Sequence, residues 1–380
     1  MKKLLALILS LCLVLSCVSA LADVASTVEG AANLTHDELV EKALAESGTF
    51  IVYGNTSRIA TAAENFGALY GITVESSNLK DGEIYTKLEN EVSAGSGADM
   101  VMIQDGANLT YALEDGWLVN YVPASVKESV GEEDLCPLVH QYINKLFIYN
   151  NLGDNVPAIT NVWELTDPAM KGNIIFKNPE SEQVNMNFLI MLTSDAWAEK
   201  LAEAYKAWAG KDIELGEYAN AGYKWIAEFL GNCVFGSSDT TIAEEVSQTT
   251  AEGKIGLFVL SKLRSSSVLT ENLTVAQYDA SANGYAIEPF SGFMYPMYAL
   301  ISAAASRPYT AMLFIEYLMT ADGFQPWGKS IGAYSSNSTL APLDGDLGIG
   351  VWKETLVMED AEYILDNGDA VRTFVTKYLQ

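Results

Sequence analysis

Histidine, cysteine and basic residues are scarce in this chain of 380 residues. It has two histidines, four cysteines, and 22 lysines and arginines against 49 aspartates and glutamates. His36 and His140 are isolated in the sequence, and the HExxH, CxxC, GxSxG and nucleotide-binding glycine motifs are all missing. The net charge of −27 repels nucleic acid and anionic lipid headgroups. These absences argue against an enzyme and predict no catalytic residue, no metal site, no cofactor and no nucleic-acid partner.

Long apolar runs are also missing, except at the N-terminus. Two lysines there precede an apolar stretch, Leu4–Ser16, and Ala20-Leu21-Ala22 follows as a small-x-small cleavage site. This order is typical of a secretory signal peptide, and the stretch is too short to span a membrane as a helix. We therefore predict that residues 1–22 are a signal peptide and that the protein is exported, to the periplasm or to the extracellular face of the cell membrane.

A lipid anchor is the alternative use of the same segment. The run Val14-Leu15-Ser16-Cys17 resembles a bacterial lipobox, in which Cys17 would be lipidated. Leu15 stands where such boxes usually carry a smaller residue, so cleavage after Ala22 is favoured. Beyond this segment only Cys136 and Cys233 remain. They allow one disulfide or two unpaired buried thiols, so the fold must rest on a hydrophobic core.

The first part of the mature chain alternates strand-like and helix-like patterns. Strand patterns at residues 49–53, 72–75 and 99–103 enclose helical patterns at residues 58–70 and 83–92. This alternation predicts βαβ units and a mostly parallel sheet. The pattern repeats after residue 146 with a different sequence. We therefore predict an α/β protein of two lobes.

Polar residues stand where two of these strands end. In open parallel sheets, ligands bind beyond the carboxyl ends of the strands, and backbone N–H groups at helix starts are free to bind them. The alternative is that Thr56 or Ser57 is an ordinary helix N-cap. The candidate binding residues from this argument are Asn55, Thr56, Ser57, Arg58, Gln104 and Asp105.

Several segments resemble one protein family. "VYGNTSR", "ENFGALYGITVESS" and "AGSGADMVMIQDGANLTYALEDGWLVNYVP" are similar to the amino-terminal lobe of bacterial extracellular solute-binding proteins of ABC importers. "VWELTDPAMKGNIIFKNP" and "AEGKIGLFVLS" resemble their second lobe, and the likeness covers about residues 47–345 in order. It is strongest to the family 1-like branch that includes ferric-iron, polyamine and related small-solute binders.

The resemblance implies a type II periplasmic-binding-protein-like fold, with two mixed sheets flanked by helices and a hinge between the lobes. It implies a monomeric receptor that captures a small solute in the interlobe cleft and delivers it to an ABC permease in the membrane. The expected segments are a signal peptide at 1–22, a flexible linker and first helix at 23–46, lobe 1 at 47–150 plus about 290–340, lobe 2 at 151–289, and a C-terminal helical segment at 341–380.

The family's ligand contacts come from loops that this chain fills with "GNTSR", "QDGAN", "NPESEQVN", "SSDTT" and "PFSGFMYP". Besides the six residues above, the resemblance therefore adds ligand-binding candidates from the later loops: Asn178, Glu180, Ser181, Ser238, Asp239, Thr240, Ser291 and Tyr295.

The kind of solute stays open between two classes. Asp105, Glu180 and Asp239 can form a cage for a polyamine-like cation, because buried carboxylates require a charged partner. A small anion such as a phosphonate or carboxylate would instead be held by Arg58, Lys262 and Arg264. The cation is slightly favoured, because the loops contain more acids than bases.

Ferric iron is not favoured by the sequence. Ferric-ion members of the family are expected to carry adjacent tyrosines after the strand that here reads "IGLFVLS", whereas this chain continues "KLRSSS". Tyr295, Tyr298 and Tyr334 are the remaining scattered candidates. Two other functions stay open: an exported carboxylate-dependent hydrolase, and a sensor that presents its solute to a membrane receptor.

Overall fold

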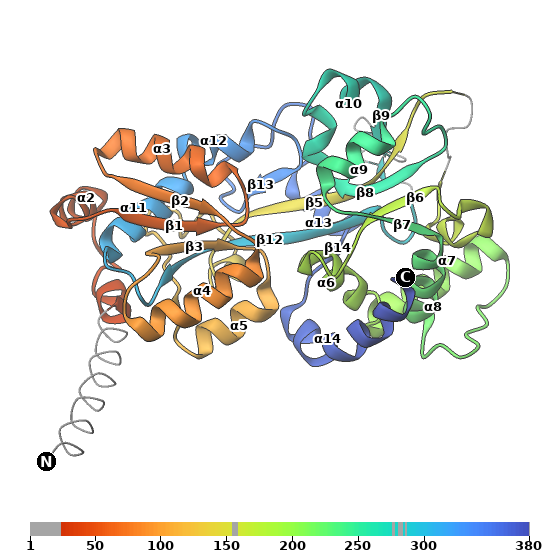
Figure 1. Ribbon diagram of the computed structural model, residues 1–380, viewed down its shortest axis with the longest axis horizontal. Coiled ribbons are helices and arrows are strands. Elements are labelled where there is room, and N and C mark those ends of the chain that lie inside the picture. The colour runs from red at the N-terminus through yellow and green to blue at the C-terminus, as the bar shows by residue number, and fades with distance from the viewer. Residues whose placement is uncertain (1–23, 154–158, 276–277, 280–283, 286, 380) are drawn as a thin grey trace, which may run out of the picture. The chain divides into compact units, whose positions relative to one another are not determined.

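The computed structural model describes residues 24–153, 159–275, 278–279, 284–285 and 287–379 (Figure 1). The predicted signal peptide and Cys17 lie outside these residues. The chain forms two compact units, which are described separately. Unit 1 consists of the chain up to Gln141 with Pro296–Lys329 and Ser335–Ala341, and unit 2 consists of Tyr142–Tyr295, Ser330–Tyr334 and Pro342–Gln380.

Unit 1 alternates strands and helices in its first hundred residues, as the sequence pattern predicts. Its elements are α2 (His36–Ala45), β1 (Phe50–Gly54), α3 (Arg58–Tyr70), β2 (Val74–Asn78), α4 (Asp81–Ala94), β3 (Met100–Ile103), α5 (Gly106–Glu114), β4 (Leu118–Val119), η1 (Glu132–Asp134), α11 (Pro308–Leu318) and α12 (Ala321–Gly328).

The sheet of unit 1 has the parallel order β2-β1-β3. Tyr53 of β1 is in register with Ser77 of β2 and with Val101 of β3. Helix α3 lies on one face of this sheet, and α4 and α5 lie on the other (Figure 1). Because β1 and β3 are parallel neighbours, the loops that follow them leave the same edge of the sheet.

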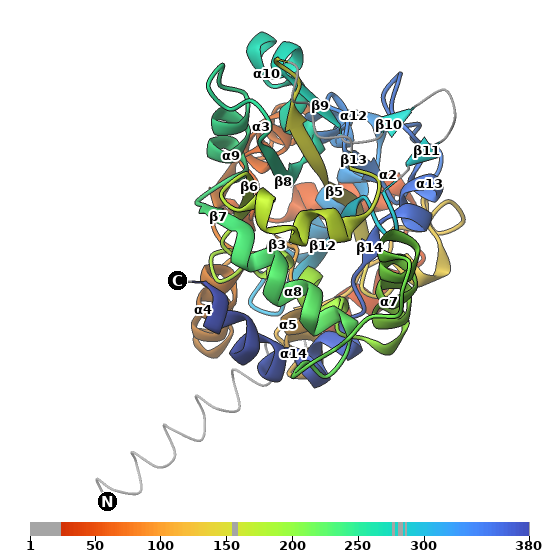
Figure 2. The same cartoon turned by 90° about the vertical axis from the view of Figure 1, so that its right-hand side faces the viewer.

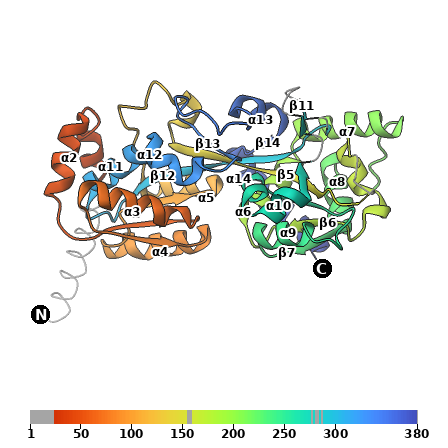
Figure 3. The same cartoon turned by 90° about the horizontal axis from the view of Figure 1, so that it is seen from above.

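An aromatic cluster forms the core on the α3 side of this sheet. The ring of Phe314 lies 5.5 Å from that of Phe50 and 4.8 Å from that of Phe66, which joins α11, β1 and α3. Helices α2 and α11 pack side by side (Figure 3). Helix α3 ends at Gly71, whose φ of 70° is readily adopted only by glycine.

Unit 2 is built from the middle and the end of the chain. Its elements are η2 (Val162–Thr166), η3 (Pro168–Met170), β6 (Ile174–Lys177), α6 (Gln183–Met191), α7 (Asp195–Ala209), α8 (Ala221–Asn232), β7 (Cys233–Gly236), α9 (Asp239–Val246), β8 (Ile255–Val259), η4 (Leu260–Arg264), α10 (Ser267–Asn272), β9 (Leu273–Val275), β10 (Tyr278–Asp279), β11 (Gly284–Tyr285), α13 (Ile349–Thr355), β14 (Val357–Met358), α14 (Ala361–Val375) and η5 (Thr376–Tyr378), to which β13 (Ala333–Ser335) contributes its first two residues.

The sheet of unit 2 has the parallel order β7-β6-β8 (Figure 2). Strand β5 (Val139–Asn150) is antiparallel to β8. Helix α9 packs against β8, and α6 packs against β6 from the other face through Phe188 and Phe176. Strand β5 and strand β12 (Gly292–Ser302) each contribute residues to both units, so the sheet of each unit uses part of both strands.

The segment before α2 differs from what its composition suggests. Residues 24–30 are helical, with Val24 and Val28 buried, in the segment expected to be a flexible linker. Cys136 and Cys233 are both free thiols, and Cys136 is exposed. Among the residues that the structure describes, no helix combines the length and apolar character that crossing a membrane requires.

His140 is a fully buried histidine in unit 1. Its ring contacts Phe324 and Trp327 at centroid distances of 5.5 and 4.9 Å, and Nε2–H donates to the carbonyl of Leu318 at 3.1 Å. Nδ1 has no hydrogen-bond partner among the described residues. Burial lowers the pKa of His140 to about 4, so the imidazole is neutral in the folded protein at pH 7.

This burial predicts a loss of stability in acid. An unfolded histidine titrates near pH 6.5, so between pH 6.5 and 4 the unfolded chain binds a proton that the folded chain does not. The free energy of unfolding should therefore fall by roughly 2–3 kcal/mol more in the wild type than in His140→Gln between pH 7 and pH 4. Urea unfolding at these pH values measures the difference. Equal pH dependence of the two proteins would contradict the assignment.

Candidate functional site

Two predicted loops of unit 1 meet at one carboxylate. Asp81, the first residue of α4, accepts hydrogen bonds from Asn55 Nδ2 at 2.7 Å and from the backbone N–H of Gln104 at 3.1 Å. Asn55 follows β1 and Gln104 follows β3. Since a carboxylate only accepts, the Asn55 amide is oriented with Oδ1 away from Asp81. This buried oxygen has no partner among the described residues.

The start of α3 is the second feature of this edge. Ser57 occupies the N-cap position without a side-chain capping bond within the described part of the chain, and Thr56 Oγ1 accepts from the backbone N–H of Arg58 at 3.3 Å. Arg58 is partly buried and donates to the carbonyl of Trp327 at 3.4 Å. Burial lowers the pKa of Arg58. The guanidinium nevertheless stays charged, because the ordinary pKa of arginine is far above neutral pH.

Asp105 has a local structural role that the sequence analysis did not assign to it. It is the N-cap of α5, and its Oδ1 accepts from the backbone N–H of Asn108 at 3.2 Å, while its other oxygen accepts from the Asn108 side chain. Tyr85 donates to its backbone carbonyl at 2.9 Å. Only 3% of Asp105 is exposed. The chain itself therefore supplies hydrogen-bond donors to this carboxylate.

Unit 2 contains a buried network of four charged side chains. Lys145 Nζ contacts the Glu182 carboxylate and lies 3.3 Å from Asp239 Oδ1. Lys177 Nζ lies 2.7 Å from Glu182 Oε1 and 3.3 Å from Asp239 Oδ2. Asn185 Oδ1 accepts from Lys145 at 3.0 Å. Two ammonium groups and two carboxylates thus compensate each other; we call Lys145, Lys177, Glu182 and Asp239 the charge quartet.

The charge quartet fixes the protonation states of its buried members. Burial alone would raise the pKa of Asp239, but Lys145, Lys177 and the backbone N–H of Val259 together lower it below its ordinary value. Burial alone would lower the pKa of Lys145, but Asp239 and Glu182 raise it. Both groups are therefore charged at pH 7.

Sequence reasoning missed three members of the charge quartet. Asp239 was predicted as a solute ligand, whereas Lys145, Lys177 and Glu182 were not singled out. A lysine inside the apolar strand pattern "YINKLFIYN" was the available signal for Lys145. Because a charged side chain enters a core only with a partner, this lysine required acidic residues from elsewhere in the chain.

The loop after β6 is held by its own hydrogen bonds. Asn178 accepts from the backbone N–H of Glu180 at 2.8 Å, and its carbonyl accepts from Ser181 Oγ at 2.7 Å. Glu180 Oε1 accepts from Thr376 at 3.1 Å at the surface. All three were predicted as solute contacts, and the structure places them in one turn. Ser238 is the N-cap of α9 through a bond to the backbone N–H of Thr241.

The last two predicted residues lie in and beside β12. Tyr295 is buried, and its ring centroid lies 5.9 Å from Lys145 Nζ. Ser291 is 2% exposed, and its Oγ has no partner among the residues described. Of the other tyrosines considered for iron, Tyr334 donates to Asp346 at 2.9 Å. Within the described residues, no group of three or more His, Cys, Asp or Glu side chains is arranged to hold a metal ion.

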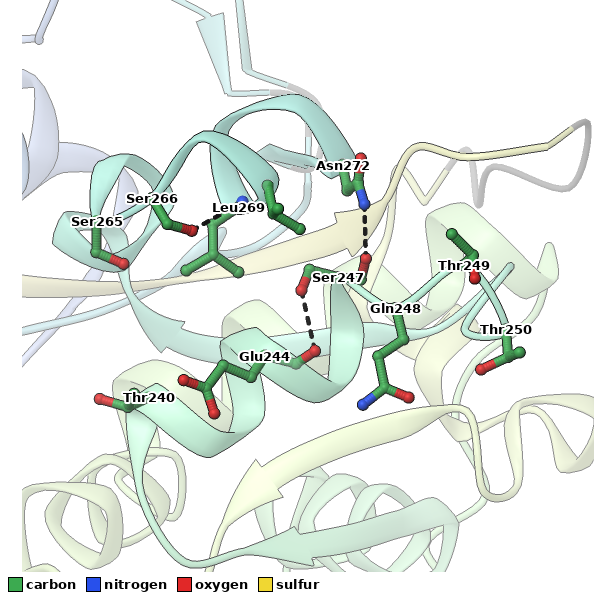
Figure 4. A pocket seen from close by; sticks show the side chains of 11 residues that line it. Thr240, Glu244, Ser247, Gln248, Thr249, Thr250, Ser265, Ser266, Leu269 and Asn272 are labelled. Carbon is green, nitrogen blue, oxygen red and sulfur yellow. Dashed lines mark hydrogen bonds between the residues drawn. The ribbon is translucent and has the colours of Figure 1, made fainter.

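A hollow of about 650 Å³ lies between α9 and α10 of unit 2 (Figure 4). Thr240, another predicted residue, lines it together with Glu244 and Gln248. Asn272 and Ser266 also border it, but their side chains bind the backbone of Ser247 and Leu269. Most lining side chains are exposed, so this hollow is open to solvent.

Comparison with known proteins decides the family. The sequence profile of the bacterial extracellular solute-binding proteins matches residues 61–348, which is most of the chain. The chain belongs to this family. A search of curated proteins gives no match. The resemblance read from the sequence is confirmed, and the family indicates an exported protein that binds a solute.

Several solved structures have a similar fold. The ferric binding protein from Campylobacter jejuni has a TM-score of 0.65 and 15% identity, with 87% of this chain and 99% of that chain covered. Iron-bound HitA from Pseudomonas aeruginosa has a TM-score of 0.63 and 14% identity, covering 87% and 99%. The periplasmic binding protein AfuA from Actinobacillus pleuropneumoniae, with fructose-6-phosphate bound, has a TM-score of 0.63 and 15% identity, covering 88% and 98%. The predicted α/β fold of type II periplasmic binding proteins is confirmed.

The charge quartet predicts a large difference between two lysines of this solute-binding protein. Lys145→Met leaves Glu182 and Asp239 with one ammonium group and should lower the free energy of unfolding by roughly 3–5 kcal/mol. Lys254 pairs with Glu245 at 3.1 Å near the surface, so Lys254→Met should cost about 0–1 kcal/mol. Urea unfolding measures both. Similar losses for the two variants would show that the buried pairing is not the stabilising feature.

Proposed function

We propose that the protein is the receptor of an ABC importer, which captures a small anionic solute outside the cytoplasm and delivers it to a membrane permease without converting it. The main observation in favour of an anion is that the acidic residues predicted to bind a cation are already engaged by other residues of the chain. Asp105 caps α5, Asp239 is paired with two lysines, and Glu180 binds Thr376 at the surface. The slight preference for a polyamine therefore has no support from the side chains that suggested it.

Unit 1 contains a positively charged side chain, Arg58, among the predicted binding residues. Arg58 is the first residue of α3, where the helix dipole also favours an anion. The guanidinium presents several N–H donors, and its one hydrogen bond given above, to Trp327, leaves most of them for carboxylate or phosphate oxygens. The free Oδ1 of Asn55 accepts a hydrogen bond, so the solute that suits this edge is an anion that also carries a hydroxyl group.

The relatives are compatible with this class. AfuA was solved with a sugar phosphate, which combines anionic oxygens with hydroxyl groups. At 15% identity this likeness shows the fold alone, so the proposal for this chain rests on Arg58 and Asn55. The hydrolase and sensor alternatives need an acid pair or a membrane partner, and solute conversion is tested together with binding below.

Thermal shift measurements test the function. Hydroxylated anions such as sugar phosphates and hydroxycarboxylates are compared with putrescine and spermidine on the exported protein. At a hundredfold excess over Kd, the true solute class should stabilise the fold by about 2.7 kcal/mol. Stabilisation by the amines alone would overturn the anion proposal. Release of a product from the stabilising anion, followed by NMR, would favour the hydrolase.

Arg58→Ala tests the site. Removing a charged hydrogen-bonding partner costs about 1.5–3 kcal/mol, so affinity for the anion should fall by roughly 10- to 150-fold. Lys42→Ala is the matched control, because Lys42 is also a cation of unit 1 but lies away from the predicted site. It belongs to α2, which leads into the amino-terminal end of β1, whereas Arg58 follows the carboxyl-terminal end. Isothermal titration of both variants measures the change. Equal affinities would remove Arg58 from the site.

The mature N-terminus is proposed to follow Ala22, with lipidation of Cys17 as the alternative. Intact mass spectrometry of the protein exported by a bacterial host separates the two. A mass that starts at Asp23 is expected. A protein that starts at a lipid-modified Cys17 would contradict cleavage after Ala22 and would show a membrane anchor.

A further inference from the structure

The ammonium group of Lys145 sits in an enclosure made by other elements of unit 2. Glu182 at the start of α6 and Asp239 at the start of α9 supply carboxylate oxygens, and Asn185 Oδ1 accepts at 3.0 Å. The rings of Phe293 and Tyr295 in β12 have their centroids 5.8 and 5.9 Å from Nζ. The Lys145 side chain has no exposed surface. We call these five residues around Nζ the ammonium cage.

The composition of the ammonium cage is that of a site for an alkylammonium ligand. An ammonium group has three N–H donors, and three side chains offer it oxygen acceptors. Aromatic rings within about 6 Å of a cation add electrostatic attraction. Carboxylates beside a cation form charge-assisted hydrogen bonds, which are stronger than neutral ones. The same oxygens and rings would bind the end of a free amine.

The charge balance explains why the cage is closed to such a ligand. Glu182 and Asp239 are also paired with Lys177, so the charge quartet is neutral only while Lys145 is present. A second ammonium ion would add an uncompensated charge to a buried site. Loss of Lys145 would instead leave one negative charge in excess. The walls formed by Glu182 and Asp239 reach solvent, with side chains 22% and 12% exposed.

We propose that the ammonium cage is an amine-binding site that the chain fills with its own Lys145, and that Lys145 thereby excludes cationic solutes from this part of unit 2. The second half of this statement rests on the proposed receptor function, whereas the existence of the cage does not. Lys145 thus acts on specificity by occupying a site rather than by contacting the solute.

Chemical rescue tests the proposal. Lys145→Ala removes the three methylene groups and the ammonium group, which together match n-propylamine in size and charge. We expect millimolar n-propylammonium to raise the melting temperature of Lys145→Ala by several degrees in a saturable manner. Wild type should show no saturable shift, because its own ammonium fills the cage.

Two controls make the result specific. Lys145→Met also removes the charge but fills the space, so n-propylamine should not rescue it. The neutral alcohol n-propanol has the size of the amine without its charge and should not rescue Lys145→Ala. Equal stabilisation of all three proteins by the amine, or equal effects of amine and alcohol on Lys145→Ala, would overturn the proposal. An absence of any amine effect on a folded Lys145→Ala protein would do so too.

A refolding experiment covers the case in which Lys145→Ala does not fold on its own. This variant keeps one negative charge in excess at Glu182 and Asp239, so n-propylammonium present during refolding should recover folded protein and n-propanol should not. Equal recoveries with the amine and the alcohol, including none with either, would overturn the proposal. Failure of these rescues leaves anion binding by wild type unaffected, so failure of the cage and failure of the receptor function are distinguishable.

Discussion

The pairing of the buried Lys145 ammonium with Glu182 and Asp239 fixes both the geometry and the charge of unit 2. Each carboxylate stands at the start of a helix that follows a strand of the parallel sheet, so one side chain of β5 holds α6 and α9 in place. A buried charge without these partners would cost several kcal/mol. The position of the two predicted binding loops that follow β6 and β7 therefore depends on charge pairing within the chain.

In both units, acidic side chains are paired with other groups of the same chain. Asp81 in unit 1 and the charge quartet in unit 2 use their acids to hold loops together, and Asp105 caps a helix. These acidic side chains are therefore engaged by other groups of the chain. The Arg58 guanidinium, by contrast, donates to the backbone carbonyl of Trp327, and in the function that we propose its charge binds an anionic solute.

The sequence pattern predicted the parallel βαβ part of the fold closely, because it is governed by local periodicity. The helix expected at residues 58–70 is α3, and the strand expected at 49–53 is β1 shifted by one residue. The roles of Asp105 and Asp239 were not predictable in the same way. Whether an acid after a strand binds a solute, caps a helix or pairs with a lysine depends on contacts such as that between Lys145 and Asp239, 94 residues apart. The helix at residues 24–30 was missed because its small residues gave little periodicity.

A crystal structure of the protein with its stabilising solute would show whether Arg58 binds an anion. We expect an anionic group of the solute within hydrogen-bond distance of the Arg58 guanidinium, a solute hydroxyl on Asn55 Oδ1, and Lys145 still enclosed by Glu182 and Asp239. A solute whose ammonium group lies against Glu182 and Asp239, or one that does not touch Arg58, would contradict this expectation.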